Sequence, residues 1–159
     1  MKTLCVYSTR TGMTKQIAET IACRTGAELL RITDGKDWSG VLGYFGAAVS
    51  GLRKTLPQLL PYRTRLPLEQ YDRIILCAPI WCENVCPVMR AFLTENMGLF
   101  RGEVCCVITH MSALSYEERM RGLELYLGRE PARWLSVQTG NYDRSKDVEA
   151  FIRGLEAET

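Results

Sequence analysis

The sequence predicts an α/β protein in which a five-stranded parallel sheet is covered by helices on both faces. Short apolar runs alternate along the chain with segments of helical periodicity, which is typical of repeated strand–helix units. Two of these runs, 72–79 and 103–109, are almost entirely apolar, as expected of strands buried on both faces. With 159 residues, 47% of them hydrophobic and 24% charged, the chain is expected to form a single domain spanning 1–159.

The first half of the chain supplies two strands, one clear helix and one ambiguous segment. Residues 4–7 form a short apolar run that we expect to be the first strand. Residues 14–26 place apolar side chains on one helical face, and Gly26 is a typical helix end. Residues 27–33 favour a second strand, whereas 40–56 have a helical pattern interrupted by glycines. The proline-rich stretch that follows indicates an irregular connection to the third strand.

The second half contains three further strand–helix units, expected at 72–79 and 87–98, 103–109 and 115–128, and 132–140 and 145–156. Pro87 suits the first turn of its helix, where the missing N–H costs nothing. Ser115, with Glu118 three residues later, forms a capping box at the start of the next helix. Ser145 is the expected cap of the last helix.

Composition and charge exclude several classes of protein. No apolar run approaches the ~20 residues of a membrane-spanning helix, and the N-terminus lacks a signal-peptide pattern. We therefore expect a cytoplasmic protein without membrane insertion. The net charge of +2 and the scattered basic residues do not favour a nucleic-acid partner. The densest basic group is typical of a solvated surface and comprises Arg53, Lys54, Arg63 and Arg65.

The seven cysteines and single histidine limit the metal and disulfide chemistry that can be expected. An odd number of cysteines without a CxxC pair indicates buried, reduced thiols rather than a disulfide framework. Cys82 and Cys86 are accordingly interpreted as packing residues rather than as a redox pair. A zinc site built from histidine and cysteine is poorly supported, because His110 is the only histidine. Walker A, GxGxxG, GxSxG and HExxH motifs are absent as well.

Three segments follow the first, third and fourth predicted strands, at the edge where open α/β sheets bind ligands. The first, 8–14, carries four hydroxyl side chains and precedes a helix, so its backbone N–H groups could hold a phosphate. Gly12 would let the backbone approach such a group closely. The alternative is a polar turn in which Thr14 caps the helix.

The other two segments carry aromatic and imidazole side chains. In 79–86, Trp81 either stacks on a planar ring or packs over the edge of the sheet. In 109–114, His110 either hydrogen-bonds to a carbonyl or an anionic ring, or is a satisfied structural histidine. Tyr116 and Tyr142 are further candidates for packing against a ring.

Two blocks of the sequence resemble the flavodoxins. The string 9–14, TRTGMT, directly after the first strand, is similar to the T/S-x-T-G-x-T phosphate-loop signature of that family. The segment 71–81, an apolar strand ending in Pro-x-Trp, and the helix 87–93 after it are similar to the family's second block. The resemblance implies a flavodoxin-like three-layer sandwich with sheet order 2-1-3-4-5 and an FMN cofactor.

The resemblance also implies which residues would contact FMN. Those expected around its phosphate are Thr9, Arg10, Thr11, Gly12, Met13 and Thr14. Those expected to border the isoalloxazine ring are Pro79, Ile80, Trp81, Cys82, Glu83 and Asn84. Those expected along its other edge are Thr109, His110 and Met111, with His110 as the candidate catalytic residue.

These observations predict an FMN-dependent oxidoreductase that passes electrons to a quinone-type or other small acceptor. Two departures favour an enzyme over an electron carrier. Glu83 stands where relatives often have glycine, and the charge of +2 differs from the strongly acidic character of carrier flavodoxins. The chain has no separate dinucleotide fingerprint, so a nicotinamide donor would have to dock transiently.

Three alternatives stay open. One is an electron-carrier flavodoxin that serves a redox protein partner. Another is an enzyme similar to the menaquinone-dependent protoporphyrinogen dehydrogenases, which residues 1–18 also resemble. The third is a cofactor-free binding module, because fold alone does not determine function. The sequence leaves the question of a homodimer open.

Overall fold

The computed structural model describes residues 1–52, 56–82, 84–111, 123–140 and 144–157. Five strands form a parallel sheet of order β2-β1-β3-β5-β6. Their bounds are Thr3–Tyr7 for β1, Glu28–Arg31 for β2, Arg73–Trp81 for β3, Glu103–His110 for β5 and Arg133–Gln138 for β6. A short strand that the sequence did not predict, β4 (Asn84–Val85), pairs antiparallel with the end of β3. Apart from β4, the predicted five-stranded parallel order is confirmed.

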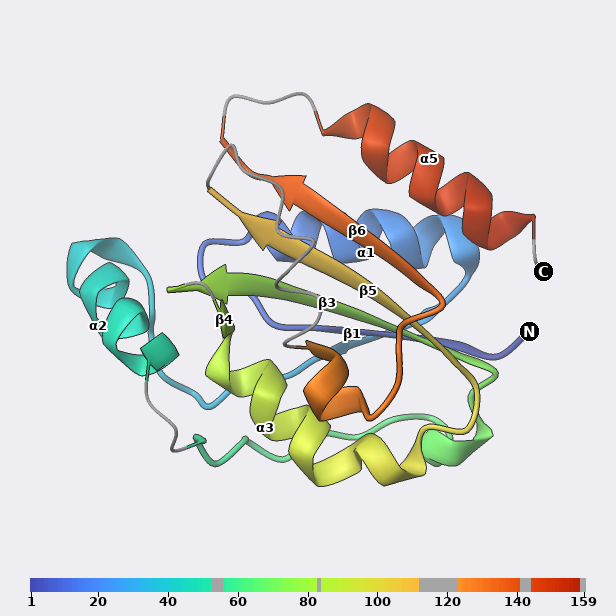
Figure 1. The fold of residues 1–159 in the computed structure, drawn as a ribbon, viewed down its shortest axis with the longest axis horizontal. Helices are drawn as coiled ribbons and strands as arrows, with labels where there is room; N and C mark the ends of the chain where they lie inside the picture. Colours follow the sequence, from blue (N-terminus) through green and yellow to red (C-terminus); the bar gives the residue numbers. More distant parts are fainter. Residues whose placement is uncertain (53–55, 83, 112–122, 141–143, 158–159) are drawn as a thin grey trace.

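Helices lie on both faces of this sheet (Figure 1). Their bounds are Met13–Thr25 for α1, Gly40–Leu52 for α2, Pro87–Asn96 for α3 and Ser145–Glu156 for α5, with 3₁₀ turns η1 at Leu68–Gln70 and η2 at Met97–Leu99. Residues 123–127 are also helical, whereas the rest of the helix predicted at 115–128, including its capping box, lies outside the described residues. None of the described helices is long and apolar enough to cross a lipid bilayer.

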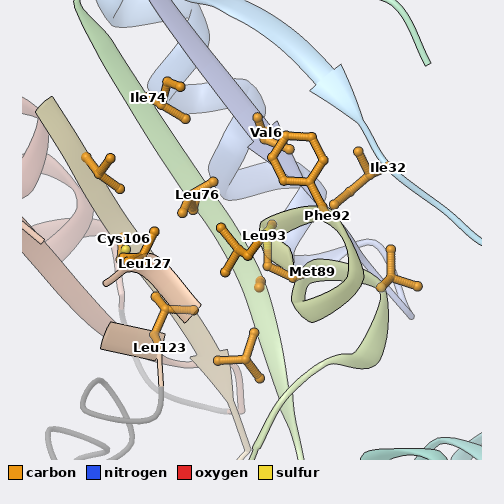
Figure 2. Packing of buried hydrophobic residues seen from close by; sticks show 14 of the residues in the cluster. Val6, Ile32, Ile74, Leu76, Met89, Phe92, Leu93, Cys106, Leu123 and Leu127 are labelled. Atoms are coloured by element: carbon orange, nitrogen blue, oxygen red, sulfur yellow. The ribbon is translucent and has the colours of Figure 1, made fainter. Parts of the chain in front are cut away.

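One face of the sheet packs against α3 and the helical residues 123–127. Figure 2 shows Ile74 and Leu76 of β3 on the same side of the sheet as Phe92 and Leu93 of α3. Leu123 joins this cluster from the second helix. Because each such side chain contributes about 1.5–3 kcal/mol when fully buried, this cluster is a major source of stability.

The opposite face packs against α1 and α5. Side chains that alternate with the first set, such as Ile75 and Val107, meet Ile21 of α1 and Ile152 of α5. This alternation follows from the two-residue period of a β-strand. The sheet therefore lies between two helical layers, which confirms the predicted three-layer sandwich.

Three of the predicted helix ends can be compared with the structure. Helix α3 begins at Pro87, as predicted. Helix α1 ends as predicted, with Gly26 in the left-handed conformation (φ 67°) as its C-cap. The prediction for Ser145 is wrong by one position, because α5 begins at Ser145 itself and Arg144 occupies the capping position.

Helix α2 differs from the other helices in its position. It lies beyond the carboxyl end of β3 rather than along the sheet, and it contacts both β3 and β4 (Figure 1). The irregular connection predicted after it is confirmed for residues 56–67, which contain no helix or strand. Arg63 and Arg65 in this connection are exposed, as predicted, whereas Arg53 and Lys54 lie outside the described residues.

Candidate functional site

The carboxyl ends of β1, β3 and β5 lie side by side at one edge of the sheet. In the strand registers Tyr7 is paired with Cys77, and Pro79 with Thr109. β1 separates β2 from β3, so the strand order reverses at this point, which is where open α/β sheets bind ligands. The structure thus brings together the starts of all three segments that the sequence singled out.

The turn between β1 and α1 requires glycine and leaves the helix start open. Gly12 is the N-cap of α1 with φ 92°, and it provides no side-chain hydrogen bond to the first turn. A Cβ placed on Gly12 would meet no atom within 4 Å. The Gly12 N–H donates to Thr9 Oγ1 at 3.0 Å, which closes the turn on itself. Uncapped N–H groups at a helix start attract an anion, so this turn is suited to a phosphate.

The remaining side chains of this turn differ in exposure. Thr11 is exposed, whereas Arg10 and Met13 are half-buried. Thr14 is buried, and its Oγ1 lies 2.8 Å from Oγ1 of the equally buried Thr109 at the end of β5. The alternative in which Thr14 caps α1 is therefore wrong, because its hydroxyl instead ties the helix start to the neighbouring strand.

The second segment is a hairpin rather than the predicted loop. β3 continues through Pro79 and Ile80 to Trp81, because Pro79 still pairs with β5 and the next two residues pair with β4. Cys82 follows at the tip of this hairpin with φ 45°, the only non-glycine residue with a positive φ in the described parts of the chain. The side chain of the exposed Asn84 donates to the Cys82 carbonyl at 3.2 Å. Glu83 lies outside the described residues.

The two cysteines of this segment have opposite environments. Cys82 is exposed, so its predicted role as a packing residue is wrong. Cys86 is buried as predicted, and burial raises the pKa of its thiol to about 11. Since a thiol reacts as its thiolate, Cys86 is inert at neutral pH.

Trp81 is buried against a second tryptophan that the sequence analysis did not identify. Its exposed fraction is 7%, and its ring centroid lies 5.4 Å from that of Trp38 at an interplanar angle of 57°. The indole nitrogen Nε1 of Trp81 is buried and has no hydrogen-bond partner in the described part of the chain. Trp38 lies between β2 and α2, in a segment without strand or helix periodicity. No sequence pattern therefore indicates that this residue packs against Trp81.

Asp34 is a further polar residue of the candidate site, in contact with Trp38. Its Oδ1 accepts a hydrogen bond from the indole N–H of Trp38 at 3.1 Å, and its Oδ2 is buried without a partner among the described residues. Such orphaned buried groups are uncommon in folded proteins and often mark places where a water or a ligand binds.

His110 is the last residue of β5 and is almost fully buried. Its Nε2 lies 2.8 Å from Ser136 Oγ on β6, and its carbonyl accepts the N–H of Thr139 at 2.8 Å. The contact with Ser136 holds the imidazole, and it is compatible with both interpretations of this residue. Met111 follows and is exposed, whereas Tyr116 and Tyr142 lie outside the described residues.

Comparison with known proteins supports the fold. No family model and no curated protein matches the sequence. Similar solved structures include a flavoprotein of Lactobacillus acidophilus in complex with FMN, with a TM-score of 0.67, 20% identity and coverage of 85% of this chain and 92% of that chain. A putative flavoprotein of Bacteroides uniformis has a TM-score of 0.74 and 22% identity, covering 96% and 97% of the two chains. A WrbA-like flavodoxin of Agrobacterium tumefaciens has a TM-score of 0.60 and 15% identity, covering 99% and 98%. The chain therefore has the flavodoxin-like fold.

Proposed function

We propose that this chain binds FMN at the carboxyl edge of its sheet and acts as an FMN-dependent oxidoreductase. The observation that carries the proposal is the open start of α1, where Gly12 in a left-handed conformation leaves space above the turn and N–H groups free for an anion. A structure with a similar fold is a flavoprotein in complex with FMN, which supports the choice of cofactor.

The phosphate would be held mainly by backbone N–H groups of the turn. The residues proposed to surround it are Thr9, Arg10, Thr11, Gly12, Met13 and Thr14. Thr14 would contribute its N–H alone, because its hydroxyl already pairs with that of Thr109. Exposed Thr11 is the side chain of this turn best placed to donate its hydroxyl to a ligand in solvent.

The ring would lie beside the hairpin and the end of β5. The residues proposed to border it are Pro79, Ile80, Trp81, Cys82, Glu83 and Asn84, with Thr109, His110 and Met111 along its other edge. The buried N–H of Trp81, which has no partner among the described residues, is a donor that a polar edge of the ring could satisfy. His110, whose imidazole is held by Ser136, is the proposed proton-handling residue.

When bound, FMN supplies the hydride and electron chemistry, and the chain binds, orients and shields it. The proposed acceptor is a small planar molecule such as a quinone. The net charge of +2 supports this choice over a carrier, because it provides no acidic field to guide a basic protein partner.

Visible absorbance of the freshly purified protein, with mass identification of any released chromophore, tests the cofactor. We expect FMN at about one molecule per chain, or stoichiometric binding when FMN is titrated into the apoprotein. A colourless protein that does not bind added FMN would contradict the proposal and favour a binding module.

Oxidation of NADH or NADPH with a quinone tests the acceptor. Turnover with the quinone would support the enzyme. Rapid reduction by a reductase without turnover of any small acceptor would instead indicate an electron carrier.

A further inference from the structure

Two neighbouring side chains, Asp34 and Lys36, contact the indole of Trp38. Its indole N–H donates to Asp34 Oδ1 at 3.1 Å, and the Lys36 Nζ lies 5.7 Å from its ring centroid. The chain then turns at Gly40, which has φ 69°, into helix α2. As a result, Trp38 packs against helix α2, which follows it in the chain.

Two glycines of α2 make this approach possible. A Cβ on Gly43 would lie 2.3 Å from both the carbonyl carbon and the carbonyl oxygen of Trp38, closer than any real Cβ contact. A Cβ on Gly46, one turn later, would lie 3.2 Å from Cζ3 of the indole ring. Neither glycine has a positive φ, so no turn requires them. Because glycine inside a helix is less favourable than alanine, close packing on Trp38 is the physical reason for both.

The indole of Trp81, unlike that of Trp38, has no hydrogen bond among the described residues to fix its orientation. It is buried, and its Nε1 makes no hydrogen bond in the described part of the chain. Its orientation therefore depends on packing, and the tilted ring of Trp38 at 5.4 Å is its aromatic neighbour at this edge. The indole of Trp38, which is hydrogen-bonded to Asp34, therefore packs against the indole of Trp81, which has no hydrogen bond among the described residues.

We infer that Trp38 is a positioning residue that holds the Trp81 indole at the edge of the sheet, and that Gly43 is required for it to do so. The part of this inference that concerns the cofactor rests on the proposed function, because Trp81 is proposed to border the ring of FMN. Trp38 acts on that ring through Trp81 and not by direct contact.

The tryptophan pair can be tested in the apoprotein by near-ultraviolet circular dichroism. Gly43→Ala keeps all three tryptophans and is expected to reduce the tryptophan bands, because the new Cβ would displace Trp38 from Trp81. Gly98→Ala is the matched control, because a Cβ there meets nothing within 4 Å, and it should leave the bands unchanged. Unchanged bands in a folded Gly43→Ala variant would overturn the inference whether or not FMN binds.

A double-mutant cycle on FMN binding tests the route of the effect. Trp38→Leu should weaken FMN binding about tenfold when Trp81 is present and less than twofold in a Trp81→Leu background. Equal losses in both backgrounds would overturn the positioning role. If Gly43→Ala does not fold, as judged by far-ultraviolet circular dichroism, the cycle decides without it. Failure of the unaltered protein to bind FMN would contradict the proposed function, while the circular dichroism result would still decide the tryptophan pair.

Discussion

Replacing Gly12 by alanine separates the backbone requirement of the first turn from its proposed role in binding. The new Cβ meets no protein atom within 4 Å, so it creates no steric overlap in the apoprotein. It does, however, impose a side chain on a residue with φ 92°, which lowers the free energy of unfolding by roughly 1–2 kcal/mol. If the phosphate of FMN lies over this turn, the same methyl group blocks it. We then expect binding to weaken at least tenfold, or about 1.4 kcal/mol.

Gly26 offers a matched control at the other end of α1. It also has a positive φ, 67°, and open space around its Cβ, so Gly26→Ala should cost about 1 kcal/mol of stability through the same strain. Urea unfolding measures the two stability losses, and titration of FMN into each apoprotein measures affinity. The assignment of the phosphate turn is refuted if Gly12→Ala binds FMN as tightly as Gly26→Ala does.

Three further predictions concern stability, each measured by urea unfolding. Gly102→Ala should cost roughly 1–3 kcal/mol, because its Cβ would lie 2.2 Å from the Asp72 carbonyl oxygen; a loss no greater than that of Gly98→Ala would contradict this. Cys82→Gly should raise the free energy of unfolding by roughly 1 kcal/mol by relieving φ 45°, and no gain would mean that this backbone is unstrained. The raised pKa of Cys86, about 11 against an ordinary 9.0, predicts stability that falls between pH 9 and 11. The unfolded chain loses the thiol proton there first, so the loss is roughly 2–3 kcal/mol, and Cys86→Ala should show a correspondingly shallower decline.

The sheet could be predicted because its central strands, β1, β3 and β5, are buried on both faces. Segments such as 73–81 and 103–110 are apolar for this reason, and a change from strand to helix periodicity separates them from their helices. The end of β3 could not be predicted, since it depends on pairing with β4, a strand of two residues. Such a short strand has no periodicity in the sequence. It forms only because the turn at Cys82 places it beside the end of β3.

The candidate site was predictable in its backbone and less so in its side chains. Gly12 was identified because a glycine in a hydroxyl-rich turn between a strand and a helix is typical of a phosphate site, and the structure adds that this glycine is left-handed. The bond between Thr14 and Thr109 joins residues far apart in the chain, and so does the contact of Trp38 with Trp81. Tertiary contacts of this kind leave no local pattern, so the sequence alone left the roles of these residues open.

The environments of the cysteines bear on how the chain could carry out redox chemistry. Cys5 and Cys77 lie between the sheet and α1 with their Sγ atoms 3.8 Å apart, and the Cys5 thiol also lies 3.8 Å from the Ala18 carbonyl oxygen. The neighbouring Cys5 thiol and burial raise the pKa of Cys77, and burial raises that of Cys106. The thiols of Cys77 and Cys106 therefore stay protonated and unreactive at neutral pH. The two exposed thiols, Cys23 on α1 and Cys82 at the hairpin tip, belong to different elements. Redox activity of this fold is thus better supplied by a group bound at the carboxyl edge than by the buried cysteines, which act as small apolar residues of the core.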